Sequence, residues 1–172
     1  MTSPFKPLLA ATVNSYEQLT FPLYASPKID GIRALGQGDI LVSRRLRPID
    51  NVFLRQAFPG HNGLDGELVF GSPTHPHCYE RTKSATGRYE GKFRCTWWVF
   101  DNYLLDLPWI ERYSRIEAEI EHPWIKVVPH TLITGPEQLV EYEGRLLDEG
   151  WEGVMLRDPQ GRYKHGRSTL NE

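Results

Sequence analysis

The chain has 172 residues, of which 40% are hydrophobic, 12% aromatic and 24% charged. This balance is that of an ordinary globular domain, and it excludes disordered and fibrous proteins. Its 20 Lys and Arg residues against 22 Asp and Glu residues give a net charge of -2, so the chain lacks the positive excess of a protein that holds nucleic acid by itself. The length predicts one domain.

The sequence carries few targeting or redox signals. Its two cysteines, Cys78 and Cys95, allow at most one disulfide, and the first residues lack the basic region and apolar stretch of a secretory signal. No apolar run approaches the roughly 18 residues that cross a bilayer. We therefore expect a cytoplasmic monomer that does not contact membranes.

Short apolar and aromatic runs bounded by Gly and Pro dominate the chain and predict β-strands. The predicted strands cover residues 23–25, 32–35, 40–43, 66–70, 96–100, 126–130 and 153–156. Helical patterns are fewer and do not alternate strictly with the strands. This order predicts an α+β domain built on antiparallel sheets.

Three segments carry helix signals. Residues 50–58 begin at an acidic cap, Asp50. The clearest segment, residues 109–122, gathers apolar side chains on one face and leaves the charged ones, Arg112 among them, outside it. The third, residues 134–149, begins with a capping box followed by an early Pro, and a Gly comes directly after it. We expect these helices to cover the sheets.

Four short segments combine reactive side chains with turns or strand ends. The first places a lysine, Lys28, at the end of a strand before an Asp-Gly turn. The others are Asp65-Gly66-Glu67, Phe100-Asp101 and Glu152-Gly153-Val154-Met155. Each segment alone could equally be structural, as a solvated hairpin or as a carboxylate that caps a turn or pairs with an arginine.

Taken in order, the four segments resemble the signature motifs of the covalent nucleotidyltransferase superfamily, which contains ATP-dependent DNA ligases, RNA ligases and mRNA capping enzymes. The pattern K-x-D-G-x-R is met by residues 28–33, and the D-G-E, F-D and E-G-V-M patterns follow. The resemblance runs from about Phe5 to the last residue and is strongest for compact, phage-type DNA ligases. It implies an ATP-grasp-like adenylation domain, an α+β fold with antiparallel sheets flanked by helices.

The resemblance implies that Lys28 is the catalytic nucleophile. Its amine would attack the α-phosphate of ATP, forming lysyl-AMP and releasing pyrophosphate. A lysine must lose its proton before it can attack, and Pro27 and Ile29 provide apolar surroundings. AMP would then pass to the 5′-phosphate of a nick in duplex DNA, and the neighbouring 3′-hydroxyl would displace it. Such sealing belongs to DNA replication, repair and recombination.

The resemblance also implies a nucleotide-binding set. Glu67 would hydrogen-bond the ribose, Arg33 would contact the sugar and phosphate side, and Phe100 offers a flat face for the adenine ring. Ser26 stands where DNA ligases often have Glu or Gln, so the choice of ATP rests on the resemblance alone. The full predicted set is Ser26, Pro27, Ile29, Arg33, Arg44, Glu67, Phe100 and Met155.

A metal ion and DNA are the other implied ligands. Glu152, with Glu67 as a second candidate, would bind Mg²⁺ or Mn²⁺, because carboxylate oxygens are hard ligands. The densest basic and aromatic segment is residues 79–94, although a solvated charged hairpin there has equal weight. Before it, the H-x-H-C-x-E pattern of residues 75–80 favours a polar loop over a zinc site. The candidate DNA phosphate contacts are Arg81, Lys83, Arg88 and Lys92.

Members of this superfamily continue into a K-x-K motif and an OB-fold domain, whereas this sequence ends at Glu172, where that motif should begin. We therefore expect residues 1–172 to be the nucleotidyltransferase domain without the final lysine motif and the C-terminal OB-fold, with weak self-adenylation. Two alternatives stay open. One is an RNA ligase or a capping-type enzyme with the same lysine chemistry, and the other is a non-catalytic remnant that binds nucleotide or DNA.

Overall fold

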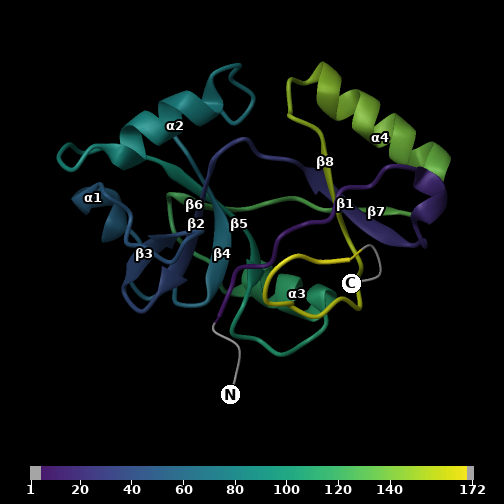
Figure 1. Cartoon of the computed structure of the whole chain (residues 1–172), viewed down its shortest axis with the longest axis horizontal. Helices are drawn as coiled ribbons and strands as arrows, with labels where there is room; N and C mark the ends of the chain where they lie inside the picture. Colours follow the sequence, from purple (N-terminus) through teal and green to yellow (C-terminus); the bar gives the residue numbers. More distant parts are fainter. Residues whose placement is uncertain (1–4, 170–172) are drawn as a thin grey trace.

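The computed structural model describes residues 5–169, which form two β-sheets with helices around them (Figure 1). The larger sheet has the strand order β3-β2-β4-β5-β6. Its pairs are antiparallel except for β5 and β6, which run parallel. In that order its strands are Ile40–Ser43, Ile32–Gln37, Leu64–Val69, Thr96–Asn102 and Ile125–Val127.

The smaller sheet has the order β7-β1-β8 and is antiparallel throughout. Its strands are Thr131–Ile133, Leu23–Pro27 and Val154–Arg157. The chain passes from β1 in the smaller sheet directly to β2 in the larger one, across residues 28–31. The Asp-Gly turn therefore lies where the two sheets meet.

Helices lie against both sheets (Figure 1). Helix α2 contacts β2 and β4, α3 contacts β5, α1 contacts β3 and α4 contacts β7. A short 3-10 helix, η1, precedes β1. The bounds are Tyr16–Gln18 for η1, Val52–Arg55 for α1, Cys78–Gly87 for α2, Trp109–Glu119 for α3 and Pro136–Asp148 for α4.

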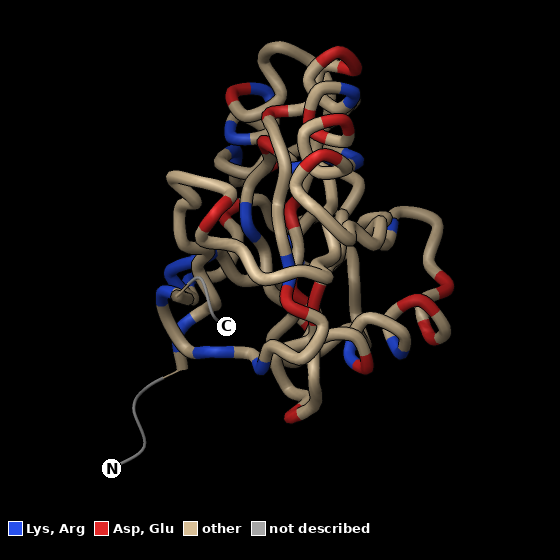
Figure 2. The backbone as a smooth tube through the Cα atoms, turned by 90° about the vertical axis from the view of Figure 1, so that its right-hand side faces the viewer, with Lys and Arg blue, Asp and Glu red and all other residues tan. Residues whose placement is uncertain are grey.

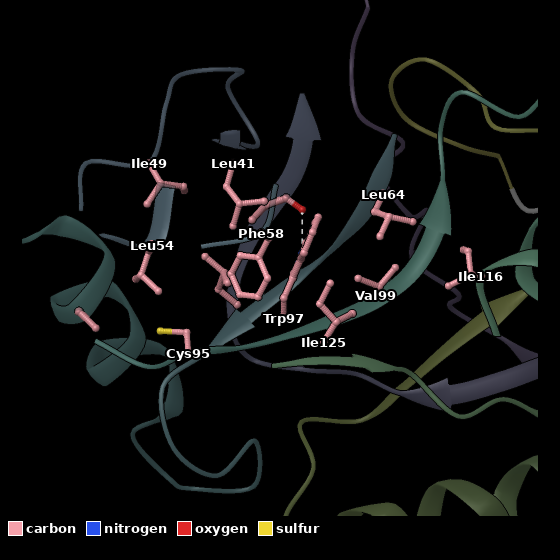
Figure 3. Close-up of a cluster of buried hydrophobic side chains, with 13 residues drawn as sticks. Leu41, Ile49, Leu54, Phe58, Leu64, Cys95, Trp97, Val99, Ile116 and Ile125 are labelled. Carbon is pink, nitrogen blue, oxygen red and sulfur yellow. Dashed lines mark hydrogen bonds between the residues drawn. The ribbon is translucent and has the colours of Figure 1, made fainter. Parts of the chain in front are cut away.

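The main hydrophobic core lies on the larger sheet, and Trp97 is fully buried near its centre (Figure 3). Strand β5 alternates buried and half-buried residues, as expected for a strand with one face on a core. The Trp97 indole N–H donates to the carbonyl of Ala34, 3.3 Å away, so the ring contributes apolar area without an unpaired donor. A second, smaller core packs α4 against the smaller sheet.

The predicted α+β class is confirmed, and the predicted strands and helices are present with shifted ends. Three features differ from the expectation. Strand β7 was not predicted, because its three residues are mostly exposed. The parallel β5–β6 pair departs from antiparallel pairing. The segment from Cys78 to Gly87 is a helix rather than a loop or hairpin, because its few buried residues are small or polar and give no apolar periodicity.

Details of the helix ends and faces also differ. Asn51, not Asp50, caps α1, since its side chain accepts a hydrogen bond from the N–H of Leu54. Helix α4 follows Gly135 without a side-chain cap, so the capping box predicted at Thr134 is wrong. Arg112 is fully buried rather than outside the apolar face of α3, because the carboxylate of Asp101 pairs with it.

Charged side chains of both signs occur along most of the chain. Lys and Arg positions are interspersed with Asp and Glu along the backbone (Figure 2), in keeping with the net charge of -2. Among residues 5–169, no helix is both long enough and apolar enough to cross a membrane.

Candidate active site

A cavity of about 890 Å³ receives residues from both sheets and from the N-terminal segment. The ends of β1 and β8 contribute from the smaller sheet, while Arg33, Glu67 and Phe100 contribute from the larger one. Residues 8–16 form a further wall. Cavities of this size hold small molecules such as nucleotides.

Lys28 lines this cavity from the residue directly after β1. Its backbone N–H donates to the carbonyl of Gly153 at 2.9 Å, which ties the lysine to the start of β8. Its amine pairs with the carboxylate of Glu152. Both side chains are 40–45% exposed, so water screens the pair and it adds little to stability. Its consequence is positional, because it holds a lysine amine beside a carboxylate at the cavity wall.

Arg33 is the most firmly held cation of the cavity. Its Nε and Nη2 atoms donate to the two carboxylate oxygens of Asp65, at 2.5 and 2.6 Å. Nη2 also donates to the carbonyl of Leu8 at 3.2 Å. Burial alone would lower the pKa of the Arg33 guanidinium, but the adjacent Asp65 carboxylate outweighs burial and raises it. Arg33 is therefore a fixed positive charge at the cavity wall.

Carboxylates accumulate near Lys28. Burial raises the pKa of Glu67 to about 8, Arg33 opposes this rise, and the charges of Asp65, Asp30 and Glu152 add to it. Burial also raises the pKa of Asp30, with a further contribution from Glu152. A divalent cation would relieve this repulsion, and carboxylate oxygens suit Mg²⁺, so the residues fit such an ion. Over the described part of the chain, however, no group of three or more acidic, His or Cys side chains encloses a site.

Apolar and aromatic groups form the remainder of the cavity wall. Ser26 and Met155 are cross-strand neighbours in β1 and β8, and both line the cavity. Phe100 faces the same space, and the Arg33 guanidinium lies 4.8 Å from the centre of its ring. The predicted residues Pro27 and Ile29 also line the cavity. A flat aromatic ring and a flexible Met side chain in the wall of one cavity suit a planar base.

Some predicted site residues lie elsewhere. Arg44 is exposed in the turn after β3 and is not part of the cavity wall. The predicted DNA contacts are likewise outside the cavity, since Arg81 and Lys83 are exposed on α2 and Arg88 and Lys92 are exposed in the segment that follows it.

The sequence does not predict three features of the site and its surroundings. Asp65 was noted only as part of a motif, yet it is fully buried and fixes Arg33. Residues 8–16 carry neither charge nor periodicity that would mark them as a cavity wall. Tyr163, far along the chain, donates a hydrogen bond to Asp65, and nothing in its local sequence signals that contact.

Solved structures with this fold define its class. The Chlorella virus DNA ligase–adenylate is 34% identical to this chain, with a TM-score of 0.82 over 96% of this chain and 65% of that one. The ATP-dependent DNA ligase of bacteriophage T7, solved in complex with ATP, is 16% identical with a TM-score of 0.71, and supports the fold alone. The fold is that of the nucleotidyltransferase domain of ATP-dependent DNA ligases.

The sequence comparison narrows the class to a family. The model of the ATP dependent DNA ligase domain matches residues 7–171, and the chain therefore belongs to this family. A DNA ligase of Haemophilus influenzae is 27% identical over 155 residues, which cover 84% of this chain and 54% of that protein. The chain thus spans about half the length of this relative.

Proposed function

We propose that this chain carries out the self-adenylation step of an ATP-dependent DNA ligase. The amine of Lys28 attacks the α-phosphorus of ATP, a P–N bond forms, and pyrophosphate leaves with the electron pair of the broken P–O bond. The amine loses its protons in the process, and lysyl-AMP remains. The AMP group then moves to the 5′-phosphate of a DNA nick, from which the 3′-hydroxyl displaces it.

One observation carries this proposal: Lys28 lines the cavity beside Glu152, in a chain of the ATP-dependent DNA ligase family. The other residues support it by position. Phe100 and Met155 offer apolar surfaces for the adenine ring, and Ser26, which lines the same cavity, offers a hydroxyl group. Arg33 supplies positive charge for the phosphates, since nucleotidyl transfer depends on positioning and on neutralising charge.

Glu152 and Glu67 are the residues that would hold Mg²⁺ or Mn²⁺. Such an ion, when bound, neutralises charge on the phosphates of the nucleotide. Glu152 has a second task in this proposal, because it keeps the Lys28 amine at the cavity wall before the nucleotide binds.

Detection of a covalent AMP adduct tests the self-adenylation step. The chain is incubated with α-labelled ATP and Mg²⁺, and intact-mass and peptide mass spectrometry look for one adenylyl group on Lys28. We expect Lys28→Ala to lose the adduct, and the matched variant Lys126→Ala, at an exposed lysine outside the cavity, to keep it. An adduct that persists in Lys28→Ala, or no nucleotide binding in the parent chain, would overturn the proposal.

Labelling with other nucleotides and sealing of nicked substrates separate the alternatives. Preferential labelling by GTP, or sealing of nicked RNA over nicked DNA, would favour a capping-type enzyme or an RNA ligase. Nucleotide bound without any adduct at saturating ATP and Mg²⁺ would favour the non-catalytic remnant.

We further propose that Arg81, Lys83, Arg88 and Lys92 contact the phosphates of the duplex. All four are exposed, and the cationic groups of Arg81, Lys83 and Arg88 lie over aromatic rings that restrain their direction. The guanidinium of Arg81 is 5.8 Å from the Phe70 ring centre and that of Arg88 is 5.6 Å from the Phe93 ring centre. Pre-positioned cations lose less side-chain entropy when they bind phosphate.

Salt dependence tests this surface. In the quadruple Ser variant of these residues, the affinity for a nicked duplex should fall, and each lost phosphate contact should reduce the slope of log affinity against log salt by about 0.9. Fluorescence anisotropy at several salt concentrations measures the slope. Arg115→Ser, at an exposed arginine of α3, is the control. An unchanged slope in the quadruple variant would remove these residues from the interface.

A further inference from the structure

Tyr163 connects three parts of the molecule that are far apart in the sequence. Its hydroxyl donates to Oδ2 of Asp65 at 2.6 Å, across a separation of 98 residues. The Tyr163 hydroxyl oxygen also accepts a hydrogen bond from the backbone N–H of Leu8 at 3.1 Å, across a separation of 155 residues. Tyr163 itself lies in the irregular segment after β8. One hydroxyl therefore joins the C-terminal segment, the N-terminal segment and β4.

The hydrogen bonds around this hydroxyl form a closed ring. Leu8 presents its N–H to Tyr163 and its carbonyl to Arg33. Arg33 and Tyr163 meet again at Asp65, where Oδ2 accepts a hydrogen bond from each of them. Asp65 is fully buried, so its charge is stabilised only if these donors stay in place. Each member of the ring thus fixes the position of the others.

The terminal segments also pair through their backbones beside this ring, where they run side by side (Figure 1). The N–H of Leu9 donates to the carbonyl of Gly166 at 2.8 Å, and the N–H of Ser168 donates to the carbonyl of Leu9 at 2.7 Å. Leu8, Leu9 and Ser168 all line the cavity. A wall of the cavity is consequently built from two extended segments that belong to neither sheet.

Tyr163 does not line the cavity, whereas the groups that it holds do. Arg33 lines the cavity and lies 4.8 Å from the centre of the Phe100 ring, and Leu8 belongs to the N-terminal segment that also lines the cavity. Loss of the hydroxyl would leave Asp65 with one donor fewer and would release the N–H of Leu8. Both changes loosen a wall of the cavity without removing any residue that lines it.

We propose that Tyr163 is a positioning residue for nucleotide binding: through its hydroxyl it holds Arg33 and the N-terminal wall in the geometry that receives ATP. The proposal rests on the proposed function of the cavity as the ATP site. It assigns Tyr163 an effect on affinity and none on the attacking amine, because Lys28 is held separately by Glu152 and Gly153.

The test compares Tyr163→Phe with Tyr103→Phe. The hydroxyl of Tyr103 donates to the carbonyl of Gly36 at 2.6 Å, so Tyr103→Phe loses one partly buried hydrogen bond in the same region, whereas Tyr163→Phe loses the bonds to both Asp65 and Leu8. Isothermal titration calorimetry with ATP should show Kd raised about tenfold in Tyr163→Phe, since hydrogen bonds to charged groups are the stronger ones, and unchanged in Tyr103→Phe. The rate of adduct formation at saturating ATP should be unchanged in both.

Hydrogen exchange provides a second readout. Amides of residues 8 and 9 should exchange faster in Tyr163→Phe than in the parent chain and keep the parent rate in Tyr103→Phe. If Tyr163→Phe does not fold, Leu8→Pro replaces it, because this variant removes the N–H that donates to the same hydroxyl. Equal ATP affinity in Tyr163→Phe and the parent, or an equal loss in both tyrosine variants, would overturn the proposal. A parent chain that binds no ATP would instead overturn the proposed function.

Discussion

Asp101 is a fully buried carboxylate that is surrounded by donors. Arg112 donates to both of its oxygens, at 2.6 and 3.0 Å, and the N–H of Asn102 donates at 2.8 Å. Arg157 adds a longer contact at 3.4 Å. Arg112 is itself only 1% exposed, so each charge depends on the other to remain buried. The Phe100-Asp101 motif therefore contains one residue that lines the cavity and one buried carboxylate that stabilises the fold.

Removal of the Asp101 carboxylate should lower the stability of the folded chain. Asp101→Asn leaves the Arg112 guanidinium buried without a counter-charge, and we expect a loss of about 3–5 kcal/mol in the free energy of unfolding, measured by urea denaturation. Asp106→Asn is the control, because the Asp106 side chain is fully exposed in its pair with Arg162 and its loss should not be measurable. Equal stability of the two variants would contradict this assignment.

His130 makes stability depend on pH. Burial first, and then the charge of Arg157, lowers the pKa of His130 to about 3, so the folded chain holds the ring neutral. The unfolded chain binds a proton near pH 6.5, and stability is therefore lost as the pH falls from 6.5 towards 3. At pH 5 this histidine should cost about 2 kcal/mol relative to pH 7.

His130→Phe isolates this effect. A Phe ring can pack as His130 does against Trp109 and Tyr113, and the Val128 carbonyl keeps the Tyr113 hydroxyl as a donor. Urea denaturation of both proteins at pH 5 and pH 7 should show a smaller loss in the variant. An equal loss in both proteins would assign the acid sensitivity to other groups.

At the scale of elements, β4 and β5 lie close together at Gly66, between the two acidic residues of the D-G-E motif. Gly66 separates Asp65 from Glu67, and a Cβ at this position would lie 2.3 Å from the carbonyl oxygen of Trp98. Only a residue without a side chain allows the strands to approach this closely. The packing of β4 against β5 therefore requires the glycine of the D-G-E motif.

Gly66→Ala should force β4 away from β5, because the obstructing atom belongs to the backbone and cannot rotate aside. We expect a loss of about 3 kcal/mol in the free energy of unfolding, together with weaker ATP binding. Gly87→Ala is the matched control, since nothing lies within 4 Å of a Cβ built there. Retained stability in Gly66→Ala would show that the strand pair adjusts.

The elements also show where local patterns mislead. Strands β2, β4 and β5 each contain apolar or aromatic residues, and the sequence predicts each of them close to its observed bounds. Helix α2 was not predicted, because it buries mainly Cys78, Thr82 and Ala85 and presents charged side chains elsewhere. A surface helix with a narrow, weakly apolar contact face leaves no 3.6-residue period of large apolar residues to detect.

At the scale of the whole molecule, the cavity is lined by residues of both sheets. β1 and β8 supply one side, and β2, β4 and β5 supply the other. A ligand that contacts both sides should stabilise the whole domain, by about 2.7 kcal/mol at a concentration of 100 Kd. Thermal unfolding with and without ATP measures this gain.

Hydrogen exchange locates the gain. With ATP bound, amides of both β1 and β4 should exchange more slowly, because the ligand links their sheets. Protection confined to one sheet would mean that ATP binds to that sheet alone. ADP, AMP and pyrophosphate, tested separately, show which part of the nucleotide links the two sides.

The sequence by itself determined the α+β class, most strand positions and the four motifs, because strand periodicity and motif spacing are local properties of a few consecutive residues. Only the tertiary structure decided which residues meet. It pairs Lys28 with Glu152 across 124 residues, and it gathers Arg33, Asp65 and Tyr163 around Leu8. The physical reason is that buried charges and donors need partners wherever the folded backbone provides them, and a local pattern does not record that choice.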